Sequence, residues 1–67
     1  MTDEVFIEKA KQLEDESAMA IMRWGLDPET LTRVARLIAT KEVEWNMSLA
    51  EGEDYDFWIK VHEKLQR

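Results

Sequence analysis

The clearest structural signal in the sequence is Trp24-Gly25-Leu26-Asp27-Pro28-Glu29-Thr30. Gly25 is placed to end a helix, because glycine adopts the left-handed backbone conformation without strain. Asp27 is a good N-cap for a following helix, Pro28 suits its first position, and Glu29 favours the positive end of its dipole. We therefore expect one helix to end just before the glycine and another to begin at the proline.

A second break falls at Glu51-Gly52-Glu53-Asp54, where Gly52 can end a helix and Asp54 can cap the next one. No part of the sequence combines alternating polar and apolar residues with β-branched enrichment, so no strand is expected. The predicted helices span roughly 3–24, 28–51 and 55–66, with Thr2 as the first cap.

These elements predict an all-α fold, a small three-helix bundle with two long antiparallel helices and a shorter C-terminal helix. A chain of 67 residues has room for one domain, which we place over 1–67. A domain of this size buries only about 60% of its chain surface and is therefore only marginally stable on its own.

Each predicted helix has a main apolar stripe at about 100° per residue, which we assign to the core. The stripe of the first helix consists of Phe6, Ala10, Leu13, Ser17, Ala20, Ile21 and Trp24. The stripe of the second consists of Leu31, Val34, Ala35, Ile38, Trp45 and Leu49. The stripe of the third consists of Phe57, Trp58, Val61 and Leu65. Because one tryptophan falls on each stripe, all three are expected to be largely buried where the helices meet.

Further apolar residues lie beside these stripes, and they exceed what one small core needs. In helical projection Val43 and Met47 face away from Trp45, with Ala39 and Ala50 beside them, and Ala18 occupies a similar place on the first helix. The predicted partner-binding residues are Ile7, Met22, Val43, Met47, Tyr55, Ile59 and His62. Such patches fit either a homodimer or a complex with a different protein.

The composition is acidic, with fifteen Asp and Glu against nine Lys and Arg, a net charge of −6. A charge of this sign opposes binding to a phosphate backbone. Cysteine is absent, so disulfides and thiolate metal sites are excluded, and a reducing cytoplasm is the expected location. Asp3 and Glu4 stand where a secretory signal carries positive charge, and the longest apolar run, 18–22, is too short to cross a membrane.

No catalytic, cofactor-binding or metal-binding constellation is expected. The only histidine, His62, follows Ile59 by three residues, so the Glu-x-x-His motif of di-iron bundles is missing. The acidic run 51–56 lacks the spacing of a calcium loop, and we interpret it as capping of the third helix. We therefore expect a protein that is not an enzyme and uses no cofactor.

The favoured function is a non-enzymatic acidic helical module that binds another protein, or a second copy of itself, and regulates or inhibits its partner by occupying a surface. One alternative is an acidic decoy for a nucleic-acid-binding surface, although the net charge is spread as −3, −1 and −2 over residues 1–24, 25–50 and 51–67. A less favoured alternative is a helix-turn-helix regulator that reads DNA with Arg33, Arg36 and Lys41. Direct nucleic-acid binding and membrane association are not expected.

Overall fold

A computed structural model describes residues 3–66 as three α-helices and one short 3-10 turn. The elements are α1 (Glu4–Ile21), η1 (Met22–Trp24), α2 (Pro28–Leu49) and α3 (Glu53–Leu65). The three α-helices pack against one another, and the described part of the chain contains no strand. The prediction of an all-α three-helix bundle is confirmed. Thr2, the predicted first cap, lies outside the described residues.

The connection between α1 and α2 has the predicted local chemistry. Gly25 follows η1 in the left-handed conformation, with φ 75° and ψ 24°. The carboxylate of Asp27 then caps α2 by accepting hydrogen bonds from the Thr30 backbone N–H at 3.2 Å and the Thr30 hydroxyl at 2.7 Å. These two bonds hold the pKa of Asp27 below its ordinary value, the hydroxyl bond contributing most. Pro28 occupies the first helical turn, as expected.

The second connection differs from the sequence-based expectation. α2 ends at Leu49, with Ala50 in an extended conformation, and Gly52 at φ 62° precedes α3 directly. The third helix therefore begins two residues earlier than predicted, and Asp54 lies inside its first turn instead of capping it. Three carboxylates in this turn favour the positive end of the helix dipole, which supports the early start.

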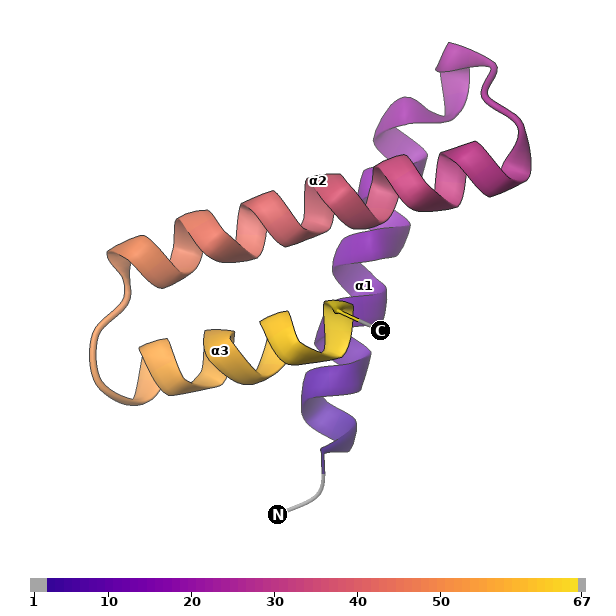
Figure 1. Cartoon of the computed structure of the whole chain (residues 1–67). Helices are drawn as coiled ribbons and strands as arrows, with labels where there is room; N and C mark the ends of the chain where they lie inside the picture. Colours follow the sequence, from indigo (N-terminus) through magenta and orange to yellow (C-terminus); the bar gives the residue numbers. More distant parts are fainter. Residues whose placement is uncertain (1–2, 67) are drawn as a thin grey trace.

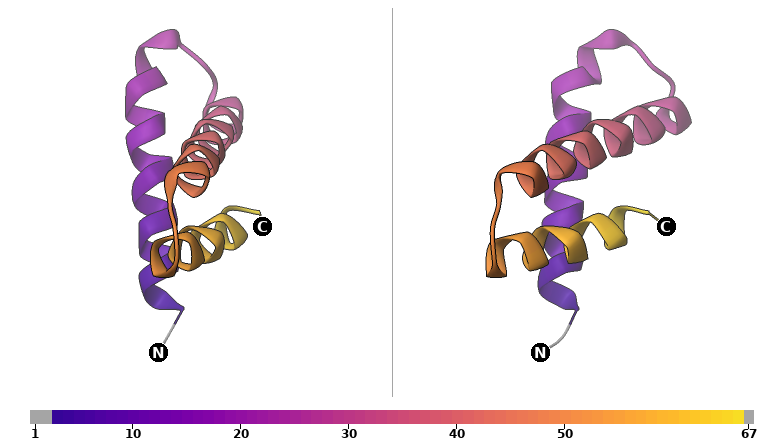
Figure 2. Two further views of the ribbon diagram at one scale, coloured as in Figure 1. Left: turned by 90° about the vertical axis from the view of Figure 1, so that its left-hand side faces the viewer. Right: turned by 60° about the vertical axis from the view of Figure 1, so that its left-hand side comes forward.

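The helices are arranged as an α2–α3 hairpin laid across α1 (Figures 1 and 2). α2 and α3 run antiparallel, whereas α2 crosses α1 steeply instead of lying alongside it, which differs from the expected pairing of the two long helices. Two features of the structure accompany this crossing. The chain makes an extra 3-10 turn and an extended step before α2, and the fully buried Ala10 and Ala39 allow close approach of the two helices.

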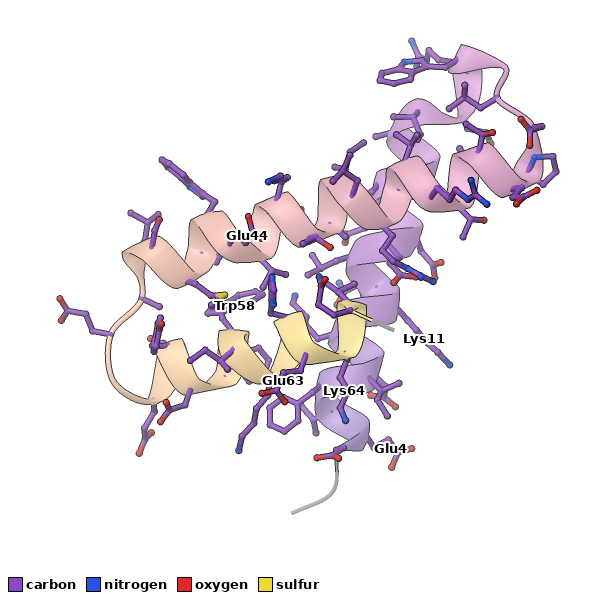
Figure 3. The ribbon with its side chains drawn as sticks, viewed as in Figure 1. Glu4, Lys11, Glu44, Trp58, Glu63 and Lys64 are labelled. Atoms are coloured by element: carbon purple, nitrogen blue, oxygen red, sulfur yellow. The ribbon has the colours of Figure 1, made fainter. Side chains whose placement is uncertain are left out.

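The core lies where all three helices meet. It consists of Phe6, Ala10, Leu13, Ala39, Val43, Val61 and Leu65. Met47, Phe57 and Trp58 pack against it while remaining partly exposed. The Phe57 ring lies between those of Phe6 and Trp58, with centroid separations of 5.5 and 5.4 Å, and Trp58 lies between α2 and α3 (Figure 3). Aromatic rings thus supply much of the packing at the start of α1.

Three ion pairs connect the helices. Two join one α-helix to another, and the third joins α3 to Asp3, the residue before α1. Arg36 Nε on α2 lies 3.4 Å from Glu14 Oε1 on α1, outside hydrogen-bonding geometry. Lys64 Nζ on α3 lies 3.2 Å from Asp3 Oδ2, next to the start of α1. Between α3 and α2, His62 Nε2 lies 3.2 Å from Glu44 Oε2. These partly exposed pairs orient the helices more than they stabilise them.

Candidate protein-interaction surface

In the C-terminal half of α2, the structure reverses the sequence-based assignment of the buried and exposed apolar residues. Val43 has no exposed surface, and Met47 packs against the core. The prediction that Val43 contributes to a partner-binding patch is therefore wrong. Met47 is only partly exposed, because one side of it packs against the core. Trp45 and Leu49, assigned to the core, are instead 66% and 67% exposed.

The reason is that α2 has two neighbours in different directions. Its buried side chains Ala35, Ala39 and Val43 recur every four residues, a spacing that advances about 40° around the helix at each step. The line of burial consequently winds around α2, which packs against both α1 and α3. A stripe drawn straight along the helix is correct near its beginning and misplaced near its end. The small side chains Ala35 and Ala39 were the signal of a close crossing.

The prediction that all three tryptophans are largely buried is also wrong. Trp24 is 62% exposed in η1, where the chain leaves α1. Only Trp58 contacts the core, and it is half-buried. Trp24 is exposed because α2 crosses α1 below this point instead of running along it (Figure 1). Ala20, also assigned to the core, is exposed.

The remaining predicted binding residues are scattered. Ile7 and Ile59 are half-buried, on different helices. Met22 and Tyr55 are exposed, Met22 beside Trp24 in η1 and Tyr55 in the first turn of α3. His62 is half-buried and contacts Glu44. The structure does not bring this set together into one surface.

The end of α2 and the start of α3 carry a concentration of negative charge. Residues 42–59 contain six carboxylates and no Lys, Arg or His. They are Glu42, Glu44, Glu51, Glu53, Asp54 and Asp56. The rest of the chain has nine acidic and nine basic residues, so this segment accounts for the whole net charge of −6. The three exposed apolar side chains Trp45, Leu49 and Tyr55 belong to the same segment. We call residues 42–59 the acidic end. They do not share one face, because Val43 is buried and Glu53 and Asp56 line a hollow with Phe6 and Lys60.

Most of the charge at the acidic end is uncompensated. Among residues 3–66, Glu44 is the only one of the six carboxylates that forms an ion pair. Its pKa is lowered, first by the hydrogen bond with His62 and then by the charge of Lys41, whose Nζ lies 3.5 Å away. The other carboxylates are exposed and supply an unpaired negative field, which extends roughly 10 Å at 0.1 M salt.

Several of the basic residues, by contrast, lie against acidic or aromatic side chains of the same chain. Arg33 pairs with Glu29 at 2.7 Å, and Arg36 lies beside Glu14. Lys9 and Lys60 lie over the rings of Trp58 and Phe6, at 5.9 and 5.2 Å from the centroids. Lys41, whose Nζ lies 3.5 Å from Glu44 Oε1, precedes Trp45 by one turn of α2 and is the nearest basic residue to it along the helix.

A second exposed apolar group surrounds η1, at the opposite end of α2 (Figure 1). It consists of Met19, Met22 and Trp24. Its one charged neighbour in η1 is Arg23. This group is apolar but lacks the strong charge of the acidic end, so it does not define the charge of a partner.

The described residues offer little else for chemistry. A hollow of about 350 Å³ is lined by Phe6, Glu53, Asp56, Phe57 and Lys60, and one of about 320 Å³ lies between Arg33 and Leu65. Within residues 3–66, no three His, Asp or Glu side chains are grouped as metal ligands. No helix in this range has both the length and the apolar character of a membrane span. Comparison with protein-family models, curated proteins and solved structures gives no match.

Proposed function

We propose that this protein is a non-enzymatic binding module that regulates or inhibits a partner protein by occupying its surface. The observation that carries the proposal is the exposure of Trp45 and Leu49, one turn apart on the part of α2 that extends beyond α1 (Figure 1). The described side chains offer a packed core and an apolar outer face. As part of the same proposal, we place the protein in the cytoplasm, because its sequence contains no cysteine and its fold needs no disulfide.

The energetics of interfaces support Trp45 as the anchor. Tryptophan is enriched among the few residues that dominate binding, where truncation costs about 2 kcal/mol or more. A buried aromatic side chain covers about 150–250 Å², and Trp45 leaves two thirds of its surface in water. Leu49, one turn further along, extends the contact. The face is a convex helix surface, which suits insertion against an apolar surface of a partner.

Affinity capture from an extract of the native host tests this proposal. We compare the unmodified protein with Trp45→Ser and with a matched control, Leu37→Ser, which alters another exposed residue of α2 (57% exposed). The expected result is a protein captured by the unmodified chain and by Leu37→Ser but lost with Trp45→Ser. Identical capture by all three proteins would contradict the proposal.

A second candidate function, an acidic decoy for a nucleic-acid-binding surface, is favoured by the absence of basic residues over 42–59. Capture by a decoy depends on charge alone, so it falls steeply with salt and is unaffected by Trp45→Ser. Direct reading of DNA by α2 is not proposed. Arg33, Arg36 and Lys41, the residues such a role needs, all form ion pairs within the chain.

A further inference from the structure

We propose that the partner docks a basic amphipathic helix against the C-terminal half of α2, with aliphatic side chains on Trp45 and Leu49 and Lys or Arg beside Glu42 and Glu51. This inference rests on the proposed function and specifies the chemistry of the partner. It combines two properties of residues 42–59, namely uncompensated negative charge and exposed apolar side chains.

The apolar contact has the dimensions of a single helix. Trp45 and Leu49 are four residues apart, which separates them by about 6 Å along α2 and about 40° around it. The half-buried Ile38 lies within about 20° of Trp45 in the same projection and continues the stripe toward α1. A stripe that is one side chain wide and a few turns long matches the apolar stripe of one amphipathic helix.

The charges beside the stripe specify the sign of the partner. Glu42 precedes Trp45 by three residues, and Glu51 follows Leu49 by two, so both flank the exposed pair along the chain. Both are exposed, and neither forms an ion pair among residues 3–66. Positive side chains on the partner would gain these interactions without displacing any internal pair. The surrounding field would also accelerate encounter with a basic partner.

The same charge argues against a second copy as the occupant. Two copies brought together through Trp45 and Leu49 would place Glu42 and Glu51 of each copy near the same residues of the other. Like charges in an interface oppose association. Lys41, the nearest basic residue to Trp45 along α2, already forms an ion pair with Glu44 of its own chain. A basic partner therefore fits this surface better than a homodimer.

The test uses two synthetic helical peptides as probes. One has Leu on one face and Lys on the other, and its twin has Glu at every Lys position. Binding of each labelled peptide to the full chain is followed by fluorescence anisotropy. We expect the Lys peptide to bind at least about tenfold more tightly than the Glu peptide, a difference of roughly 1.4 kcal/mol.

Matched variants then separate specific docking from general attraction to an acidic protein. Trp45→Ser is expected to weaken the Lys peptide about tenfold, whereas Leu37→Ser leaves its affinity within about twofold. The double variant Glu42→Gln/Glu51→Gln is expected to weaken binding about fivefold, and Glu4→Gln/Glu8→Gln, which removes two exposed carboxylates of α1, has a smaller effect. Circular dichroism of each variant verifies that its helix content is unchanged.

The outcomes distinguish the failure of this inference from the failure of the proposed function. Equal affinity for the two peptides, or equal weakening by the acidic-end variants and their α1 controls, would overturn the basic-helix inference. So would dimerisation of the free chain through Trp45, detected by sedimentation and lost in Trp45→Ser. In each case, capture of a host protein that depends on Trp45 would leave the proposed function standing. Capture that is independent of Trp45 would refute the proposed function itself.

Discussion

Replacing Val43 and Trp45 one at a time by Ala tests the orientation of α2, on which the assignment of the binding surface depends. Val43 has no exposed surface, and its replacement removes two methyl groups. At about 0.8 kcal/mol for each group, with a further contribution from the cavity, unfolding should become easier by about 2–3 kcal/mol. A domain of 67 residues has a total stability of only about 3–10 kcal/mol, so the melting temperature should fall by roughly 10–20 °C.

Trp45→Ala should behave oppositely. The side chain is two thirds exposed, so its loss should change stability by less than about 0.5 kcal/mol, and the higher helix propensity of Ala offsets part of the change. Urea unfolding followed by circular dichroism measures both variants, and an unchanged m-value shows that their transitions are comparable. A loss of about 3–5 kcal/mol for Trp45→Ala, the value for a buried tryptophan, would refute the assigned orientation.

Three further predictions concern the connections and the α2–α3 contact. Asp27→Ala should lower the melting temperature by roughly 4–8 °C, because the Thr30 backbone N–H loses its acceptor, and an unchanged melting curve would contradict the capping role. Gly25→Ala should cost about 1–2 kcal/mol in urea unfolding, because φ is 75° although no atom crowds the position, and Gly25→Asn should cost less. The carboxyl carbon of Glu44 should titrate by NMR with a pKa below 4.5, and His62→Ala should raise that pKa. Because the pKa is lowered in the folded state, the stabilising contribution of Glu44 is present above the unfolded value and lost as the pH falls through the folded one; a titration unaffected by His62→Ala would show that the contact is absent in solution.

The sequence was sufficient to predict the three helices and the position of both breaks between them. Gly25, Asp27 and Pro28 each have a backbone preference that acts within a few residues, so the start of α2 at Pro28 was predicted correctly. The first α-helix ends at Ile21, three residues before the predicted end, and η1 covers the difference. The second break was less certain. Gly52 and Asp54 both suit a helix terminus, and in the structure Gly52 precedes the helix while Asp54 lies in its first turn.

The sequence was insufficient for the orientation of α2, and therefore for the candidate site. A straight apolar stripe through Ile38, Trp45 and Leu49 has a good helical period, but it assumes one packing partner in one direction. α2 packs against α1 and α3, which lie on different sides of it, so burial follows Ala39 and Val43 instead. The angle at which α2 crosses α1 decides between the two lines. That angle is a tertiary property, set by close packing that includes Ala10 and Ala39, and helical periodicity contains no information about it.

A two-dimensional NMR spectrum of the indole N–H groups, recorded with a soluble paramagnetic agent, tests the account most directly. The three tryptophans serve as internal references for one another. In the free protein, the signals of Trp24 and Trp45 should be strongly broadened, and that of Trp58, which contacts the core, should be protected. On addition of the Leu/Lys peptide, Trp45 should become protected while Trp24 remains broadened. A protected Trp45 in the free protein, or one that stays broadened with saturating peptide, would contradict the account.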